Sequence, residues 1–105
     1  MKITTYEDWL ALNDLQRRSV AEKWNAYKGE GLGFAHVAAG RLAIASSIPV
    51  LHIRVGIYHG GEYILNLFVD DKVIATMPMR FEQNFEGFRV GWRPYSQLDP
   101  HSANP

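Results

Sequence analysis

Apolar residues recur at helical spacing through the first half of the chain. The first such segment predicts a helix over residues 5–12, and Thr4 with Glu7 three positions later has the spacing of a capping box at its start. A second helix is predicted to begin at Asn13 and to run to about Tyr27, because apolar residues again fall at intervals of three and four. Both segments are therefore predicted to be short amphipathic helices.

A third helix is predicted over residues 33–47, where small and larger apolar residues alternate and only Arg41 carries a full charge. The near absence of charge indicates a helix that is covered on most sides. The stretch before it, YKGEGLGF at residues 27–34, has glycines at alternating positions. A helix precedes this stretch, no Gly-Lys-Ser/Thr follows, and Glu30 would repel an anion, so we interpret it as a hinge between helices and not as a phosphate-binding loop.

After Pro49 the apolar period changes from helical to two. Four segments follow this pattern and predict an antiparallel meander: residues 50–59, residues 62–69, a strand ending near Pro78, and residues 88–93. Residues 80–87 are expected to be an irregular connection. The predicted fold class is α+β, with the N-terminal helices packed on one face of a C-terminal antiparallel sheet of about four strands. Residues 1–95 should form a single domain, followed by a polar tail at residues 96–105.

The pairing of the first two strands decides which side chains face the helices. If Gly60 and Gly61 form a two-residue turn, Tyr58 pairs with Tyr63 and Ile57 with Ile64. The core face then carries Ile53, Val55, Ile57, Ile64 and Phe68. The outer face carries His52, Arg54, Tyr58, Tyr63, Leu65, Leu67 and Val69. This mixture of aromatic, aliphatic and cationic groups indicates either a binding surface or a face that another part of the chain covers to make a minor core.

Composition and charge narrow the classes of function. The chain has 105 residues, with eleven basic and eleven acidic side chains, so its formal net charge is zero and no overall field would draw it to nucleic acid or to an anionic membrane. The absence of cysteine excludes disulfides and cysteine zinc sites. The longest uncharged run, residues 42–53, is too short for a membrane helix. The acidic N-terminus does not fit a secretory signal, so a cytoplasmic location is expected.

No motif indicates catalysis. His52 and His59 lie seven positions apart on one predicted strand, so they should face opposite ways and cannot share a metal ion. No serine lies in a strand-turn-helix elbow, and the carboxylates are explained by caps and turns. Basic and aromatic residues mix in residues 85–95 as in a base-stacking platform, but Glu82 and Glu86 lie close by, so nucleic-acid binding is not expected. No catalytic residue, cofactor or metal is predicted.

These observations favour a non-enzymatic protein-binding domain. The functional class that suits the profile is a small cytoplasmic bacterial or phage inhibitor of the immunity type, which neutralises a partner protein such as a toxin by stoichiometric binding. The predicted partner-binding residues are His52, Arg54, Tyr58, Tyr63, Leu65 and Leu67. The alternative is a small enzyme or ligand-binding domain with a His/Arg/Tyr site on the outer sheet face, suited to phosphoryl or RNA chemistry. A homodimer through the same face is a third possibility.

Overall fold

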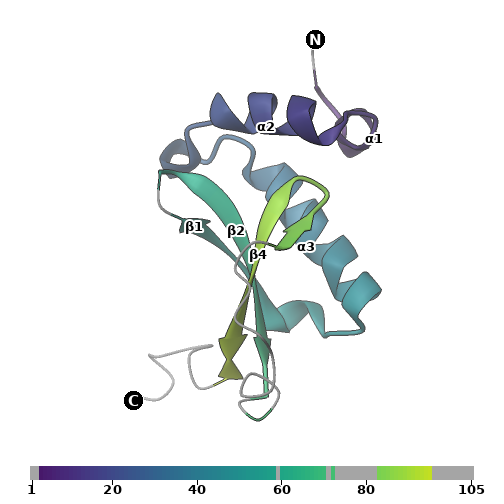
Figure 1. The fold of residues 1–105 in the computed structure, drawn as a ribbon, viewed down its shortest axis with the longest axis vertical. Helices are drawn as coiled ribbons and strands as arrows, with labels where there is room; N and C mark the ends of the chain where they lie inside the picture. The colour runs from purple at the N-terminus through teal and green to yellow at the C-terminus, as the bar shows by residue number, and fades with distance from the viewer. Residues whose placement is uncertain (1–2, 59, 71, 73–82, 96–105) are drawn as a thin grey trace.

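A computed structural model describes residues 3–58, 60–70, 72 and 83–95. Helices lie over one face and one end of a four-stranded sheet (Figure 1). The helical elements are α1 (Tyr6–Leu10), α2 (Asp14–Glu22), the short 3-10 helix η1 (Ala26–Lys28), α3 (Leu32–Ser46) and the 3-10 helix η2 (Val50–His52). The strands are β1 (Ile53–Tyr58), β2 (Glu62–Val69), β3 (Gln83–Phe85) and β4 (Phe88–Pro94).

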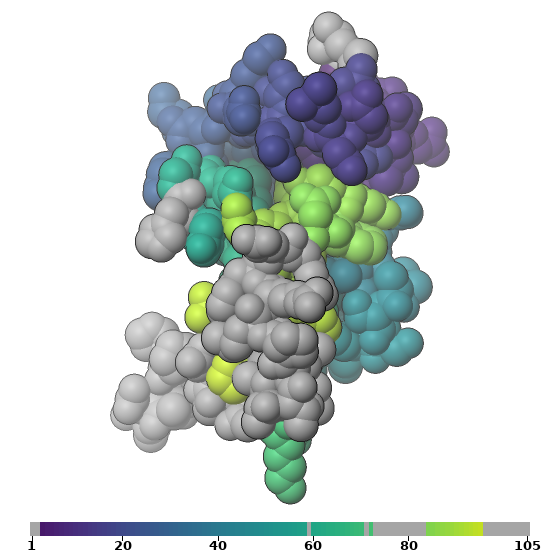
Figure 2. All heavy atoms as spheres, viewed as in Figure 1, coloured from purple at the N-terminus to yellow at the C-terminus, as the bar shows by residue number. Residues whose placement is uncertain are grey.

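The fold class is α+β, as predicted, but the sheet is mixed and not purely antiparallel. The strand order is β1-β2-β4-β3, and the two central strands, β2 and β4, run parallel, with Ile64 beside Arg89 and Val69 beside Pro94. Of the helices, α3 packs against β1 and β2, whereas α1 and α2 lie across one end of the sheet (Figures 1 and 2). The predicted meander with all helices on one face is therefore wrong. The predicted strand ending near Pro78 lies almost entirely outside the described residues.

A short hairpin replaces part of the predicted irregular connection. Strands β3 and β4 pair antiparallel, with Phe85 beside Phe88, so Glu86 and Gly87 form the turn. Both turn residues have positive φ, 51° and 94°, as a primed two-residue turn requires. The sequence pattern did not reveal this hairpin because glutamate is not a residue typical of that turn position.

The helix starts follow the capping signals, with one shift along the chain. The capping box of α1 consists of Thr5 and Asp8, one residue later than predicted, and that of α2 consists of Asn13 with a glutamine three positions on, as its sequence indicated. Helix α2 ends at Glu22, earlier than predicted. Asn25 competes with helix continuation here, because its side chain accepts a hydrogen bond from the Tyr27 N–H and starts η1.

An aromatic cluster joins the helices to the sheet. Trp9 is fully buried and packs against Trp24, Phe34 and Phe88, with ring centroids 5.2, 5.8 and 5.3 Å away. Its indole Nε1–H donates to the Glu86 carbonyl at 2.7 Å, so the one polar atom of this side chain is satisfied. These contacts fix α1, α3 and β4 relative to one another.

The glycine-rich stretch is a tight connection between η1 and α3, in agreement with the hinge interpretation. Gly29 and Gly31 both have left-handed φ, 80° and 79°. Trp24 packs directly on Gly31, where a Cβ atom would lie 2.3 Å from the indole ring. This residue must therefore be glycine both for its φ and for the close approach of Trp24.

Candidate functional site

The observed register of the first hairpin differs from the predicted one by one residue. Tyr58 pairs with Glu62 and Ile57 with Tyr63, so the connection comprises residues 59–61 and not two glycines alone. Because side chains alternate along a strand, this shift turns every side chain of β2 to the opposite face. The sequence could not decide the register, since β2 is apolar at nearly every position and either face would suit a core.

Half of the predicted partner-binding surface is consequently in the core. Tyr63, Leu65 and Leu67 are 6%, 0% and 1% exposed, so their predicted place on the outer face is wrong. The Tyr63 hydroxyl donates to the Glu30 carbonyl at 2.6 Å, and burial together with the nearby Glu30 charge raises the pKa of this tyrosine. Ile64, placed on the core face by the sequence, lies on the outer face instead and is also buried.

The remaining predicted residues do not converge on one site. His52 lies in η2, with its Nδ1 atom 3.3 Å from the Tyr95 hydroxyl, beside the start of β1. Tyr58 lies at the opposite end of the same strand, where the Arg89 guanidinium sits 4.6 Å from its ring centroid. Arg54 is exposed on the outer face between them. With Tyr63 on the other side of the sheet, the four residues of the predicted His/Arg/Tyr site cannot line a common pocket.

An exposed apolar surface lies on the outward side of α3. The side of this helix that faces the sheet buries Ala35, Ala38, Ala39, Leu42 and Ala43. On the opposite side, Val37 and Ile44 are 45% and 84% exposed, and η2 adds Val50 and Leu51, 54% and 75% exposed. The expectation that this helix is covered on most sides is therefore wrong for its outward side. We call the residues Gly33, Val37, Gly40, Ile44, Val50 and Leu51 the α3 surface.

Two glycines in the α3 surface have no packing role against the other residues that the structure describes. A Cβ atom added at Gly33 or Gly40 would meet no atom within 4 Å. Glycine inside a helix lowers helix stability by about 1 kcal/mol relative to alanine. The contacts of the described residues do not explain why glycine occupies the interior position 40. The sequence carries the relevant signal, because Gly33 with Gly40 and Val37 with Ile44 each recur after seven residues on one helix face.

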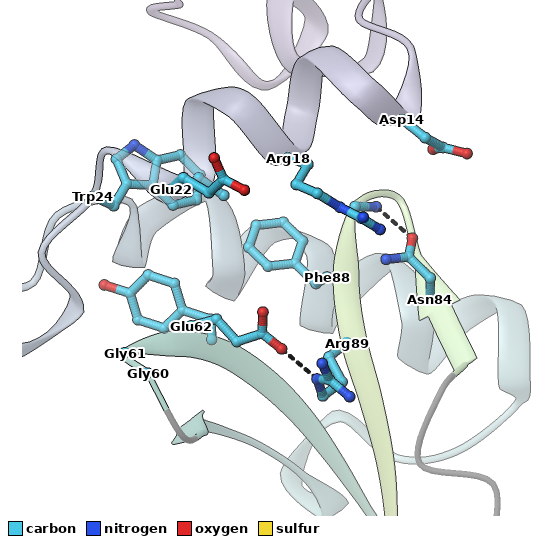
Figure 3. Close-up of a pocket in the computed structure, with 13 residues that line it drawn as sticks. Asp14, Arg18, Glu22, Trp24, Gly60, Gly61, Glu62, Asn84, Phe88 and Arg89 are labelled. Carbon is cyan, nitrogen blue, oxygen red and sulfur yellow. Dashed lines mark hydrogen bonds and ion pairs between the residues drawn. The ribbon is translucent and has the colours of Figure 1, made fainter.

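A cleft of about 750 Å³ separates α2 from the neighbouring ends of β2 and β4 (Figure 3). Its helical wall carries Asp14, Arg18 and Glu22, which are four residues apart and so share one face of α2. The facing wall carries Glu62 at the start of β2 and Arg89 on β4, which form an ion pair. Trp24, Tyr63 and Phe88 provide the apolar lining. We call this feature the α2 cleft.

The charges in the α2 cleft alternate in sign along α2, in the order Asp14, Arg18, Glu22. Figure 3 shows Glu22 beside Trp24 at one end of the cleft, whereas the Glu62 carboxylate points toward Arg89, with which it forms an ion pair. The Arg18 side chain points instead toward Asn84, at the side where Arg89 also lies. These residues could not be grouped from the sequence, because Glu22 on one wall and Glu62 on the other are forty positions apart and meet only in the folded chain.

Glu86 forms a polar clamp that holds the β3–β4 turn to the helices. Its carboxylate accepts a bidentate pair from Arg41, Nε to Oε1 at 2.8 Å and Nη2 to Oε2 at 2.9 Å, and a hydrogen bond from the Tyr6 hydroxyl at 2.7 Å. Burial alone raises the pKa of Glu86, but these donors and the nearby positive charges outweigh it and hold the pKa below its usual value. Burial and the hydrogen bond to Glu86 raise the pKa of Tyr6 well above its usual range.

Other kinds of site find no support among the residues that the structure describes. No three histidine or carboxylate side chains in this part of the chain gather as metal ligands. No described helix is long and apolar enough to cross a membrane. Comparison of the chain with protein-family models, with curated proteins and with solved structures finds no match. Among the described residues, the α3 surface and the α2 cleft are therefore the two candidate sites.

Proposed function

We propose that this chain is a non-enzymatic protein-binding domain that acts by stoichiometric binding, and that the α3 surface is where its partner docks. The observation that carries the proposal is the exposure of Val37, Ile44 and Leu51 on a helix and turn with one charged residue, Arg41. A helix that is apolar on all sides is normally buried on all sides. Here one side stays open, which is typical of a helix whose remaining neighbour belongs to another molecule.

The energetics favour a partner at this surface. Complete burial of one valine, leucine or isoleucine side chain contributes roughly 1.5–3 kcal/mol, so burial of the exposed parts of the α3 surface would supply a large share of a specific binding energy. Docking would not strand a charge either, because the Arg41 guanidinium is already paired with Glu86. The surface therefore offers apolar area at little desolvation cost.

The two glycines indicate the shape of the expected partner. Open space at Gly33 and Gly40 lies on the same helix face as the protruding side chains of Val37 and Ile44. Such an alternation of small and large residues lets a second helix approach closely, with its own side chains over the glycines. We therefore propose that the partner presents an apolar helix.

Within this general function, we propose the inhibitor class that the sequence profile favoured, a small cytoplasmic bacterial or phage protein that neutralises a partner such as a toxin. A compact rigid domain with an apolar docking helix suits stoichiometric inhibition, which needs a surface and no assembled catalytic set. The alternative of an enzyme with His52, Arg54, Tyr58 and Tyr63 at one site has weaker support, because the sheet separates Tyr63 from the other three. A homodimer through the α3 surface is an outcome that the following test distinguishes.

The test is affinity capture from the native host with three tagged chains. The wild type is compared with the double variant Ile44→Asp, Leu51→Asp and with the control Leu15→Asp, which changes a side chain of similar exposure on α2. We expect the wild type and the control to retain the same partner, and the double variant to recover roughly tenfold less or lower, since aspartate would bury a charge against an apolar helix. Circular dichroism checks that each variant is folded.

Two results would count against the proposal. Equal capture by the wild type and the folded double variant would exclude the α3 surface, and failure of the wild type to retain any protein would remove the protein-binding function. Light scattering on the purified chain tests for self-association. If the wild type has the mass of a dimer and the double variant has the mass of a monomer, the partner is a second copy of this chain.

A further inference from the structure

We infer that the α2 cleft is a separate binding site for a small zwitterion of the amino-acid or short-peptide class. The ammonium group of the ligand would lie at the end with Glu22 and Glu62, and its carboxylate at the side with Arg18. This site lies between α2 and the neighbouring ends of β2 and β4, and it does not depend on the α3 surface.

The dimensions and rigidity of the α2 cleft suit such a ligand. Its volume of about 750 Å³ lies within the range of small-molecule sites, roughly 300–1,000 Å³. Trp24 is held between Gly31 and the stacked ring of Trp9, and the hydroxyl of Tyr63 is fixed by its hydrogen bond to Glu30. The apolar lining is therefore formed before any ligand arrives, which limits the entropy lost on binding.

The acidic end provides for a cation. Glu22 is exposed, and it forms no ion pair or hydrogen bond with the other residues drawn in Figure 3, so its carboxylate is available to a ligand. Glu62 faces the same space from β2, and Trp24 lines it. An ammonium group placed there would gain the Glu22 carboxylate and an aromatic neighbour, with Glu62, shared with Arg89, as a further negative charge.

The basic side provides for an anion. Arg18 reaches across from α2 toward the amide of Asn84, so a carboxylate there would meet a guanidinium and an amide donor. Arg89 adds positive charge, but it is shared with Glu62 and stacked on Tyr58, so Arg18 is the principal anchor. The two ends together favour a ligand with both charges.

Ligands with a single charge sign fit less well. A phosphate or dicarboxylate would be repelled by Glu22 and Glu62, and a simple amine would be repelled by Arg18 and Arg89. Each wrong ligand meets a like charge at one end of the cleft, which is how a site discriminates by repulsion as well as attraction.

The test titrates the full chain, labelled with nitrogen-15, with trialanine and with its N-acetylated and C-amidated forms. We expect millimolar binding of trialanine, seen as amide shifts confined to residues around the α2 cleft. Removal of either terminal charge should weaken the affinity roughly tenfold, since each loses a charge-assisted hydrogen bond. Shifts that are scattered over the chain, the absence of shifts at millimolar trialanine, or equal affinity for the capped and uncapped forms would overturn the inference.

Two variants assign the ends of the site. Glu22→Gln should weaken binding of trialanine and leave binding of the N-acetylated form unchanged. Arg18→Gln should weaken binding of trialanine and leave binding of the C-amidated form unchanged. Glu7→Gln, an exposed carboxylate on α1 that does not line the cleft, is the control and should change neither. The variant Ile44→Asp, Leu51→Asp should bind trialanine with the affinity of the wild type. A failure of the α3 surface as a docking site would therefore leave the trialanine result unchanged, and a failure to bind trialanine would leave the capture result unchanged.

Discussion

At the scale of single residues, Glu86 shows how a side chain offsets an unfavourable backbone. Its φ of 51° lies in the left-handed region, where a residue other than glycine or asparagine is uncommon. The bidentate contact with Arg41 and the hydrogen bond from Tyr6 connect this glutamate to both α3 and α1, and these contacts offset its unfavourable φ. The clamp ties the only described turn of the β3–β4 hairpin to the helical layer.

We predict that Glu86→Gln lowers the free energy of unfolding by about 1–2 kcal/mol at neutral pH, because a partly exposed charged pair is exchanged for neutral hydrogen bonds. The folded state holds the pKa of Glu86 below its unfolded value. Its contribution is therefore complete above a pH of about 4.3, the ordinary glutamate pKa, and is lost as the pH falls through the lower folded value.

Urea unfolding at several pH values measures this effect, with Glu7→Gln as the control for loss of an exposed carboxylate. The difference between wild type and Glu86→Gln should shrink as the pH falls through the acid range. A difference that stays constant with pH, or a variant as stable as the wild type, would show that the clamp does not stabilise the fold.

At the scale of secondary-structure elements, the sequence was informative where the signals are local. The capping pair at Asn13, the long apolar helix and the strand at residues 88–93 all follow from residues within one or two turns of each other. The register of β1 and β2 did not follow, because an apolar residue on both faces of β2 leaves the alternation without a preferred side. The parallel pairing of β2 with β4 depends on the path of the chain between them, which local patterns do not encode.

Helix α3 offers a prediction that separates folding from binding. Gly40→Ala should raise the free energy of unfolding by about 0.5–1 kcal/mol, because alanine favours the helix and the added Cβ atom meets no other atom within 4 Å. The same variant should weaken partner capture, since the methyl group fills the space proposed for a second helix. Thermal unfolding and capture are measured on the same preparation.

Gly31→Ala is the matched control, and it should destabilise the chain because its Cβ atom would lie 2.3 Å from the Trp24 ring. If Gly40→Ala stabilises the fold and binds the partner as well as the wild type, the glycine has no role in docking. If it destabilises the fold, the outward side of α3 is not open as described.

At the scale of the whole molecule, binding must come from local surfaces, since eleven basic and eleven acidic residues leave no net charge to attract a partner. The sequence placed its candidate binding surface on the outer sheet face, where Ile64 and Phe68 are in fact 4% and 7% exposed. Overall apolar periodicity did not indicate which side of α3 is exposed, because the helix is apolar all round, and only the seven-residue recurrence of Gly33 with Gly40 and of Val37 with Ile44 marks that side. The α2 cleft could not be found either, since Arg18 and Arg89 meet only through the fold.

Site-specific photo-crosslinking in the native host tests most directly whether the partner docks on the α3 surface. Benzoylphenylalanine is placed at position 44 on α3 in one chain and at position 15 on α2 in another, two positions that are 84% and 77% exposed in the wild type. We predict a discrete adduct with one protein from position 44 and none from position 15. Adducts of equal yield from both positions, or none from position 44 while the wild type still captures its partner, would contradict a docking site on α3.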